Sequence, residues 1–189
     1  ADGRFIAYRS QVTPGYESDR FRLMLYDRKT GRTQSISESL HSNVAEFTFT
    51  ADSKWIYLGA EARGRVAVYS LSTNGGQVKK ILGEGANGDI NVSSDGKTLV
   101  FAHNSMTRPN EIFTARSDGS NPTPLTKVNE AMIASFGLKP AEEVSWPGAL
   151  GAKVAGWIVK PANFNPKKKY PLAVLIHGGP QGAWSDNWG

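Results

Sequence analysis

The sequence predicts a mainly β protein, made of the C-terminal blades of a β-propeller followed by the first strands of an α/β domain. Three observations predict this fold class. Three stretches repeat one pattern, in which a turn aspartate and a basic residue precede a strand. Glycine and proline are frequent, at 20 and 10 of 189 residues, which indicates many turns. One apolar run near the C-terminus ends directly in glycines, which is typical of a covered strand in a parallel sheet.

The repeated stretches are Asp2–Tyr8, Asp52–Leu58 and Asp95–Phe101. They begin about 40 to 50 residues apart, the period of a four-stranded propeller blade. Each is followed by a second strand, a turn and a short last strand. The second strands are Arg22–Asp27, Val66–Leu71 and Glu111–Ala115, the turns are Asp27–Gly31, Ser72–Gly76 and Arg116–Gly119, and the last strands are Thr33–Ile36, Val78–Leu82 and Thr123–Leu125.

Two alternating stretches, Glu46–Phe49 and Asp89–Val92, supply the first strands of the second and third units. The first unit lacks such a strand, and its longer spacing comes from the loop Gln11–Asp19. We therefore expect about two and a half blades. A closed ring needs at least four, so the rest of the propeller is expected outside this sequence. Periodicity alone leaves a β-sandwich with similar turns as an alternative.

The blade pattern stops at Lys127–Lys139, where alanine, methionine and phenylalanine predict a short helical or irregular connector ended by Gly137. A hairpin is then expected, with strands Glu142–Trp146 and Val154–Lys160 around Pro147–Gly151. We expect a partial propeller over residues 1–126, a connector over 127–141 and the start of a second domain over 142–189.

The second domain contains the stretch most informative for function. Leu172–Ile176 is an unbroken apolar run introduced by Pro171, and it predicts a strand covered on both faces in a parallel sheet. His177-Gly178-Gly179-Pro180 follows, where glycines let the backbone turn sharply and bring N–H groups close to a ligand. Open α/β sheets bind ligands at this end of their strands.

A glycine turn after the third strand supplies one oxyanion-hole N–H in α/β-hydrolases. The motif HGGPQG (177–182), entered by Lys169-Tyr170-Pro171, resembles the prolyl oligopeptidase family of serine peptidases, and most closely its acylaminoacyl-peptidase and bacterial dipeptidyl-peptidase branch. The order of blades, connector, hairpin, strand and glycine turn agrees with that family over essentially the whole chain.

The resemblance implies a serine exopeptidase that acts on short peptides, of dipeptidyl- or acylaminoacyl-peptidase type. The N–H of Gly179 would face the tetrahedral intermediate, with Gly178 shaping the turn. No Gly-x-Ser-x-Gly elbow occurs in the chain, so the catalytic Ser, Asp and His are expected beyond Gly189. The resemblance implies neither a metal nor an organic cofactor.

For the other candidate residues, the sequence allows either a structural or a functional role. Because the triad histidine follows serine and aspartate in this fold, His177 is expected to stabilise the turn. Trp184 and Trp188 could line a substrate cleft or pack in a core. The sequence favours loop or strand-end roles for four more residues over metal binding or contact with a peptide terminus: His41, His103, Arg108 and Glu111.

Composition limits the partners. The net charge is +5, but the basic residues are dispersed apart from Lys167–Lys169 in a predicted loop, so no nucleic-acid surface is indicated. No apolar run reaches membrane-spanning length. The absence of cysteine excludes disulfides and thiolate chemistry in this segment. The expected partners are short peptides and the rest of the polypeptide, while homo-oligomer formation and a periplasmic or cytoplasmic location stay open.

Two rival functions share parts of this pattern. A propeller that only binds partners would account for residues 1–126 but not for HGGPQG after an apolar run. An esterase of the α/β-hydrolase fold would share the glycine turn but would lack the preceding propeller.

Overall fold

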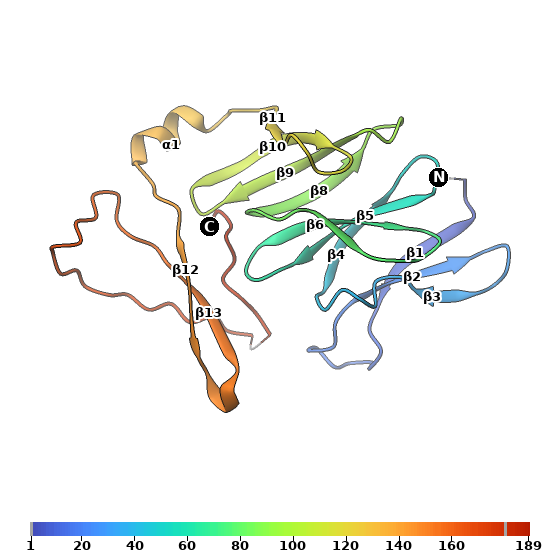
Figure 1. Cartoon of the computed structure of the whole chain (residues 1–189), viewed down its shortest axis with the longest axis horizontal. Coiled ribbons are helices and arrows are strands. Elements are labelled where there is room, and N and C mark those ends of the chain that lie inside the picture. The colour runs from blue at the N-terminus through green and yellow to red at the C-terminus, as the bar shows by residue number, and fades with distance from the viewer. Residues whose placement is uncertain (1, 180) are drawn as a thin grey trace.

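A computed structural model describes residues 2–179 and 181–189 (Figure 1). Its first part is a series of antiparallel blades, followed by a short helix, a hairpin and an extended segment. The first blade, blade 1, has three strands in the order β1 (Phe5–Ser10), β2 (Arg22–Asp27) and β3 (Thr33–Ser35). No strand among the described residues precedes β1 in this sheet, as the sequence predicts.

Two complete four-stranded blades follow. Blade 2 contains β4 (Val44–Phe49), β5 (Trp55–Glu61), β6 (Val66–Ser72) and β7 (Lys79–Leu82). Blade 3 contains β8 (Ala86–Val92), β9 (Thr98–Ser105), β10 (Arg108–Arg116) and β11 (Thr123–Pro124). The two blades share a single parallel bridge, between Val66 and Ala86, and every other pairing within them is antiparallel. The three predicted units are therefore confirmed, with strand ends displaced by a few residues.

The aspartate turns are equivalent, as the repeat predicts. The Asp52 and Asp95 carboxylates each accept the main-chain N–H of the basic residue two positions later, at 3.1 and 3.0 Å. Each also accepts a hydroxyl from two positions earlier, at 2.6 Å. Asp2 accepts the corresponding main-chain N–H at 3.0 Å. In both complete blades, the residue after the turn aspartate has a left-handed backbone conformation, with φ of 58° at Ser53 and 70° at Gly96.

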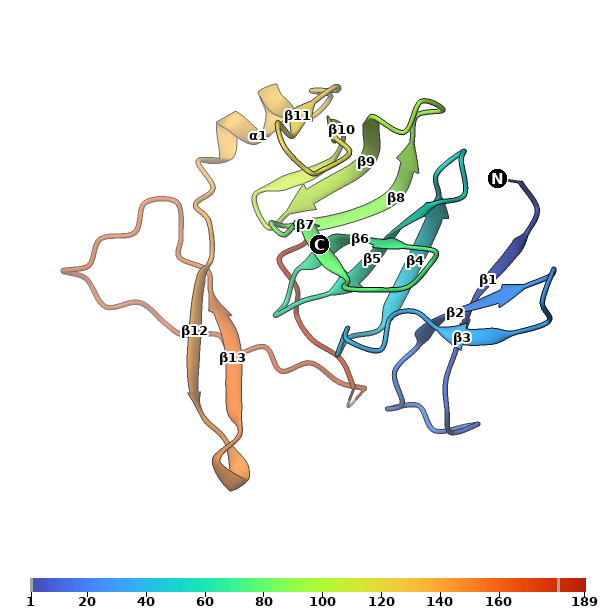
Figure 2. The ribbon, with the colours of Figure 1, turned by 45° about the vertical axis from the view of Figure 1, so that its right-hand side comes forward.

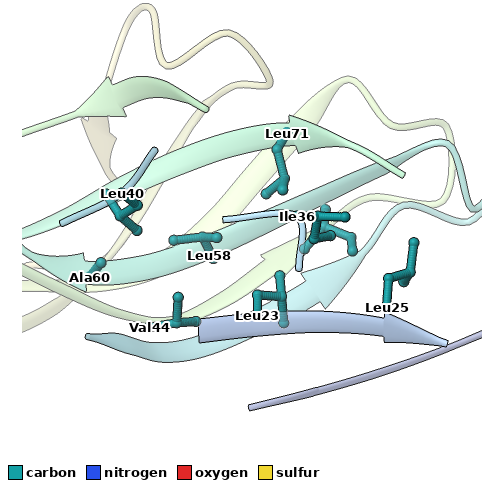
Figure 3. Packing of buried hydrophobic residues seen from close by; sticks show 9 residues of the cluster. Leu23, Leu25, Ile36, Leu40, Val44, Leu58, Ala60 and Leu71 are labelled. Atoms are coloured by element: carbon teal, nitrogen blue, oxygen red, sulfur yellow. The ribbon is translucent and has the colours of Figure 1, made fainter. Parts of the chain in front are cut away.

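The hydrophobic core lies between the faces of successive blades. One cluster joins blade 1 to blade 2, and Figure 3 shows its leucines pointing toward one another between β2 and β5. A second cluster joins blade 2 to blade 3 around Leu99, Phe101 and Phe113. Apolar residues of the inner strands, such as Leu23 and Leu25 on β2 and Ile56 and Leu58 on β5, face the first cluster, so the blades stabilise one another by burying apolar surface.

The connector contains α1 (Glu130–Phe136), which ends at Gly137 in the left-handed conformation (φ 60°). This agrees with the predicted short helix. The hairpin that follows consists of β12 (Glu142–Pro147) and β13 (Lys153–Ile158), joined through the 3-10 turn η1 (Ala149–Gly151). Figure 2 shows the turn end of this hairpin projecting away from the blades, while the C-terminal segment returns to their edge. No helix among the described residues is long and apolar enough to cross a membrane.

The predicted strand at Leu172–Ile176 is wrong for this chain. The segment forms no ladder, and its side chains are exposed, from 70% at Val174 to 87% at Leu172. A parallel strand needs neighbouring strands that are distant in sequence, and the described residues provide none beside this segment. The apolar run is therefore present without the sheet that would cover it.

Candidate active site

The glycine turn adopts a conformation that suits glycine alone. Gly179 has φ of 135°, a region that residues with a Cβ rarely enter. A Cβ built there would lie 3.3 Å from the main-chain nitrogen of Gln181, whereas one at Gly178 would meet nothing within 4 Å. Pro180, the last residue of the HGGP motif, lies outside the described residues. Gly179 therefore has a backbone conformation and surroundings that a residue with a Cβ would disturb.

His177 contacts only its own turn. Its Nδ1 lies 3.4 Å from the carbonyl oxygen of Gly178, and the ring is exposed. Within the described part of the chain, no serine hydroxyl or carboxylate forms a hydrogen bond with this ring. These contacts fit the turn-stabilising role expected from the sequence.

Downstream of the turn, Trp184–Trp188 forms the segment that we call the attachment segment. Its central residue bonds to two blades. The main-chain N–H of Asp186 donates to the carbonyl oxygen of Gly64 in the β5–β6 turn at 2.6 Å. The Asp186 carboxylate accepts the main-chain N–H of Met106 in the β9–β10 turn at 2.9 Å. Sequence analysis did not single out Asp186, and no motif in the sequence distinguishes it from other loop aspartates.

The two tryptophans of the attachment segment also make hydrogen bonds through their main chains. The carbonyl oxygen of Trp184 accepts the indole N–H of Trp157 on β13 at 2.9 Å. The main-chain N–H of Trp188 donates to Asn104 Oδ1 at the end of β9, also at 2.9 Å. Both indole rings stay accessible, with Trp184 56% and Trp188 37% exposed. The structure brings them close to the blade ends but shows no closed core around them.

Arg65 connects blade 2 to the hairpin. Its guanidinium lies 4.8 Å from the ring centre of Trp157 and bonds to the Glu143 carboxylate at 3.0 Å. Glu84, just before blade 3, lies 3.5 Å from Arg65 Nε. The neighbouring Gly64 has φ of 70°, and a Cβ there would lie 3.1 Å from the Trp157 indole nitrogen. A planar cation between two carboxylates and an indole is a geometry that lysine cannot reproduce.

Glu111 on β10 holds the start of the connector. Its side chain is 5% exposed, and its carboxylate accepts the Thr126 hydroxyl and the main-chain N–H of Asn129, the latter at 2.9 Å. These hydrogen bonds hold the pKa of the Glu111 carboxyl below its usual value. Contact with a peptide terminus, the functional alternative for Glu111, is not compatible with these partners. Arg108 instead lies over the Phe113 ring, 5.7 Å from its centre.

His103 is half-buried at the same end of blade 3. Its Nδ1 lies 2.9 Å from Asn87 Oδ1, and its ring packs on Phe113 at 4.8 Å between centres. Burial, with a smaller contribution from Arg108, lowers the pKa of His103. The ring therefore packs as a strand-end residue.

One surface hollow is formed by blade residues. It has a volume of about 290 Å³ and lies between blades 1 and 2, bordered by Arg4, Asp27, Arg32 and Thr73. Arg4 is already paired with Asp27 at 2.7 Å. None of the described residues of the glycine turn borders this hollow.

The fold and the turn together define a class of protein, a β-propeller joined to the start of an α/β domain. Similar folds are known. The acylaminoacyl peptidase of Pyrococcus horikoshii superposes with a TM-score of 0.79 at 22% identity, over 100% of this chain and 28% of that one. The β-propeller domain of the Trilobed protease from Pyrococcus furiosus superposes with a TM-score of 0.54 at 23% identity, over 68% of this chain and 37% of that one. At these identities the likeness shows the fold alone.

Curated relatives extend the comparison to sequence. Dipeptidyl-peptidase 5 of Schizosaccharomyces pombe is 32% identical over 192 residues, which cover 99% of this chain and 27% of the relative. Dipeptidyl-peptidase 5 of Arthroderma benhamiae is 30% identical over 99% of this chain and 26% of the relative. No family model matches the chain. These relatives confirm the resemblance to the prolyl oligopeptidase family of serine peptidases, and the chain spans about a quarter of their length.

Proposed function

We propose that the chain is part of a serine exopeptidase that hydrolyses short peptides, of dipeptidyl- or acylaminoacyl-peptidase type. The observation that carries this proposal is the positive φ of Gly179, in an HGGP turn that follows an apolar run and a propeller. Residues 1–126 would be propeller blades, residues 127–141 a connector and residues 142–189 the start of the peptidase domain. The propeller would restrict access to small substrates.

In this proposal, the N–H of Gly179 donates to the oxyanion, and Gly178 gives the turn its shape. A serine supplied by the rest of the polypeptide attacks the peptide carbonyl, and a histidine takes its proton and passes it to the leaving amine. The carbonyl oxygen becomes negatively charged only as the tetrahedral intermediate forms. A fixed N–H at that position therefore stabilises the transition state more than the bound substrate.

Trp184 and Trp188 are proposed substrate contacts. Both rings are accessible, and both follow the glycine turn closely in sequence. Aromatic rings can bind the apolar side chains of a short peptide through a large contact area.

The experiment that tests the proposal uses the full-length protein and the variant Gly179→Ala, with dipeptidyl- and acylaminoacyl-p-nitroanilides as substrates. A Cβ at φ of 135° must displace the turn. We expect kcat to fall on the order of 100-fold, with KM changed much less. Gly151→Ala is the control, because Gly151 also has a positive φ (79°) but a Cβ there would meet nothing within 4 Å.

Thermal unfolding of both variants separates a local effect from loss of the fold. A folded Gly179→Ala enzyme with wild-type turnover would contradict the oxyanion role, and an inactive wild-type protein would contradict the peptidase assignment. Esters hydrolysed without any amide hydrolysis would favour an esterase of the same fold.

A further inference from the structure

The glycine turn has no bonds of its own to the blades. Among the described residues, the hydrogen bond recorded for His177–Gly179 stays within the turn, from His177 to Gly178. The apolar run before the turn is exposed and unpaired. Among the described residues after Gly179, hydrogen bonds to the propeller are made by the attachment segment, Trp184–Trp188.

The attachment segment contacts three separate places that precede it in sequence. Asp186 bonds to the β5–β6 turn through its N–H and to the β9–β10 turn through its carboxylate. Beside this second turn, the N–H of Trp188 adds a hydrogen bond to Asn104 at the end of β9. Both turns belong to blades 2 and 3, which share a hydrophobic core cluster.

The third place is the hairpin. Trp157 donates to the carbonyl oxygen of Trp184, and Arg65 lies over the Trp157 ring while it pairs with Glu143. Arg65 thus orients the indole that orients the attachment segment. Because the Arg65 side chain is only 22% exposed, its charge is less screened by solvent than that of an ordinary surface arginine.

We propose that Asp186 is a positioning residue, whose carboxylate ties the chain after the glycine turn to the propeller and thereby fixes the Gly179 N–H. The inference rests on the proposed function, because it assigns Asp186 a role at the same oxyanion turn. Donors to an oxyanion act only within a narrow range of distances, and a displacement of about 1 Å suffices to lose most of their effect. Blade 3 therefore contributes to catalysis through the main-chain N–H of Met106 without touching the substrate.

The test compares Asp186→Ala, Asp186→Asn and Asp118→Ala in the full-length enzyme. Alanine removes the acceptor for Met106, while asparagine keeps an oxygen acceptor and loses only the charge. Asp118 is a matched control, since it accepts the main-chain N–H of Ser120 at the same distance of 2.9 Å but in the β10–β11 turn. The substitution Asp118→Ala removes this hydrogen bond from blade 3 and leaves the attachment segment unchanged.

We expect Asp186→Ala to lower kcat about tenfold with KM changed less than about twofold, as expected for a transition-state effect. Asp186→Asn should recover most of this loss, and Asp118→Ala should turn over like the wild type. Crystal structures of the wild type and Asp186→Ala provide a readout that needs no activity. In them, the Gly179 nitrogen should move by about 1 Å in the variant.

Wild-type kcat in Asp186→Ala, or equal losses in Asp186→Ala and Asp118→Ala, would overturn the positioning role. An unmoved Gly179 nitrogen would overturn it as well, whatever the kinetics. If the wild type hydrolyses neither class of p-nitroanilide, the proposed function fails, and the position of the Gly179 nitrogen alone then decides the role of Asp186.

Discussion

Blade 2 and the segment around the glycine turn both contain short apolar runs, but they bury them to opposite extents. In β5, the residues from Ile56 to Ala60 are buried, and Leu58 is 0% exposed. In Leu172–Ile176, Leu175 is 77% exposed. Past Gly119, none of the described residues is buried. Apolarity therefore does not decide burial by itself, and the difference between the two regions lies in the supply of partners.

Blade strands find partners nearby in sequence. The strand β5 pairs with β4 and β6 through short turns, so little chain entropy is lost when the sheet forms. A parallel strand such as that predicted at Leu172–Ile176 pairs with strands that are distant in sequence, because parallel neighbours are joined by long crossover connections. The comparison teaches that blades can fold from local sequence, whereas a parallel sheet depends on distant segments.

Among the substitutions in the packed blades, Gly119→Ala is expected to lower the free energy of unfolding most. Gly119 is buried with φ of 85°, and a Cβ there would lie 2.1 Å from the Ile81 carbonyl oxygen at the junction of blades 2 and 3. Backbone strain and overpacking together should lower the free energy of unfolding by about 3 kcal/mol or more. Urea unfolding of the two proteins gives the difference.

Gly96→Ala is the control for this substitution. Gly96 has a similar φ of 70°, but a Cβ there would meet nothing within 4 Å. It should cost only the strain of the left-handed conformation, about 1 kcal/mol. Equal losses for the two variants would show that the blades do not approach one another closely at Gly119.

A second prediction sharpens the comparison directly, because the same atoms are removed from the two regions. Leu58→Ala should lower the free energy of unfolding of the 189-residue chain by about 3 kcal/mol, since it leaves a cavity in the core. Leu175→Ala should change it by less than about 0.5 kcal/mol, because the side chain is exposed.

In the full-length protein, the two substitutions should become comparable if Leu172–Ile176 enters a covered sheet there. Urea unfolding of both variants in both lengths of chain measures this. If Leu175→Ala stayed neutral in the full-length protein, the proposed peptidase-domain strand would be contradicted.

The smallest effect concerns the connector between the two regions. The Thr126 hydroxyl, together with the Asn129 N–H, lowers the pKa of Glu111 below its ordinary value of 4.5. A carboxyl whose pKa is depressed on folding stabilises the protein above its unfolded pKa. That contribution is lost as the pH falls below 4.5 and through the folded pKa.

Glu111→Gln keeps the shape of the side chain and removes this titration. We expect its melting temperature to decline less steeply than that of the wild type between about pH 6 and about pH 3. Parallel declines would mean that other carboxylates, such as those of the aspartate turns, account for the acid sensitivity.

Much of the fold could be predicted because its determinants are local. The period of the aspartate turns placed the blades, and the turn chemistry at Asp52 and Asp95 is identical in the structure. The connector helix and its end at Gly137 likewise followed from neighbouring residues. The glycine turn after the apolar run also followed from neighbouring residues, and Gly179 has a positive φ there.

The contacts around the turn could not be predicted in the same way. Asp186 bonds to residues that precede it by many tens of positions, and nothing in its immediate sequence marks it. The same holds for Arg65 and Trp157, which come from different parts of the chain and meet only when the hairpin lies against blade 2. Glu111 was considered for ligand contact, and its role in the connector appears only in three dimensions.

The sequence by itself determined the blade strands, their turns and the end of the connector helix, because these depend on dihedral preferences and hydrogen bonds between residues close in the chain. Only the tertiary structure decided which apolar runs are buried and which side chains connect the glycine turn to the blades. Burial and long-range hydrogen bonds depend on which surfaces are available to meet. For Leu172–Ile176 the described residues supply no such surface, and for Asp186 they supply two blade turns.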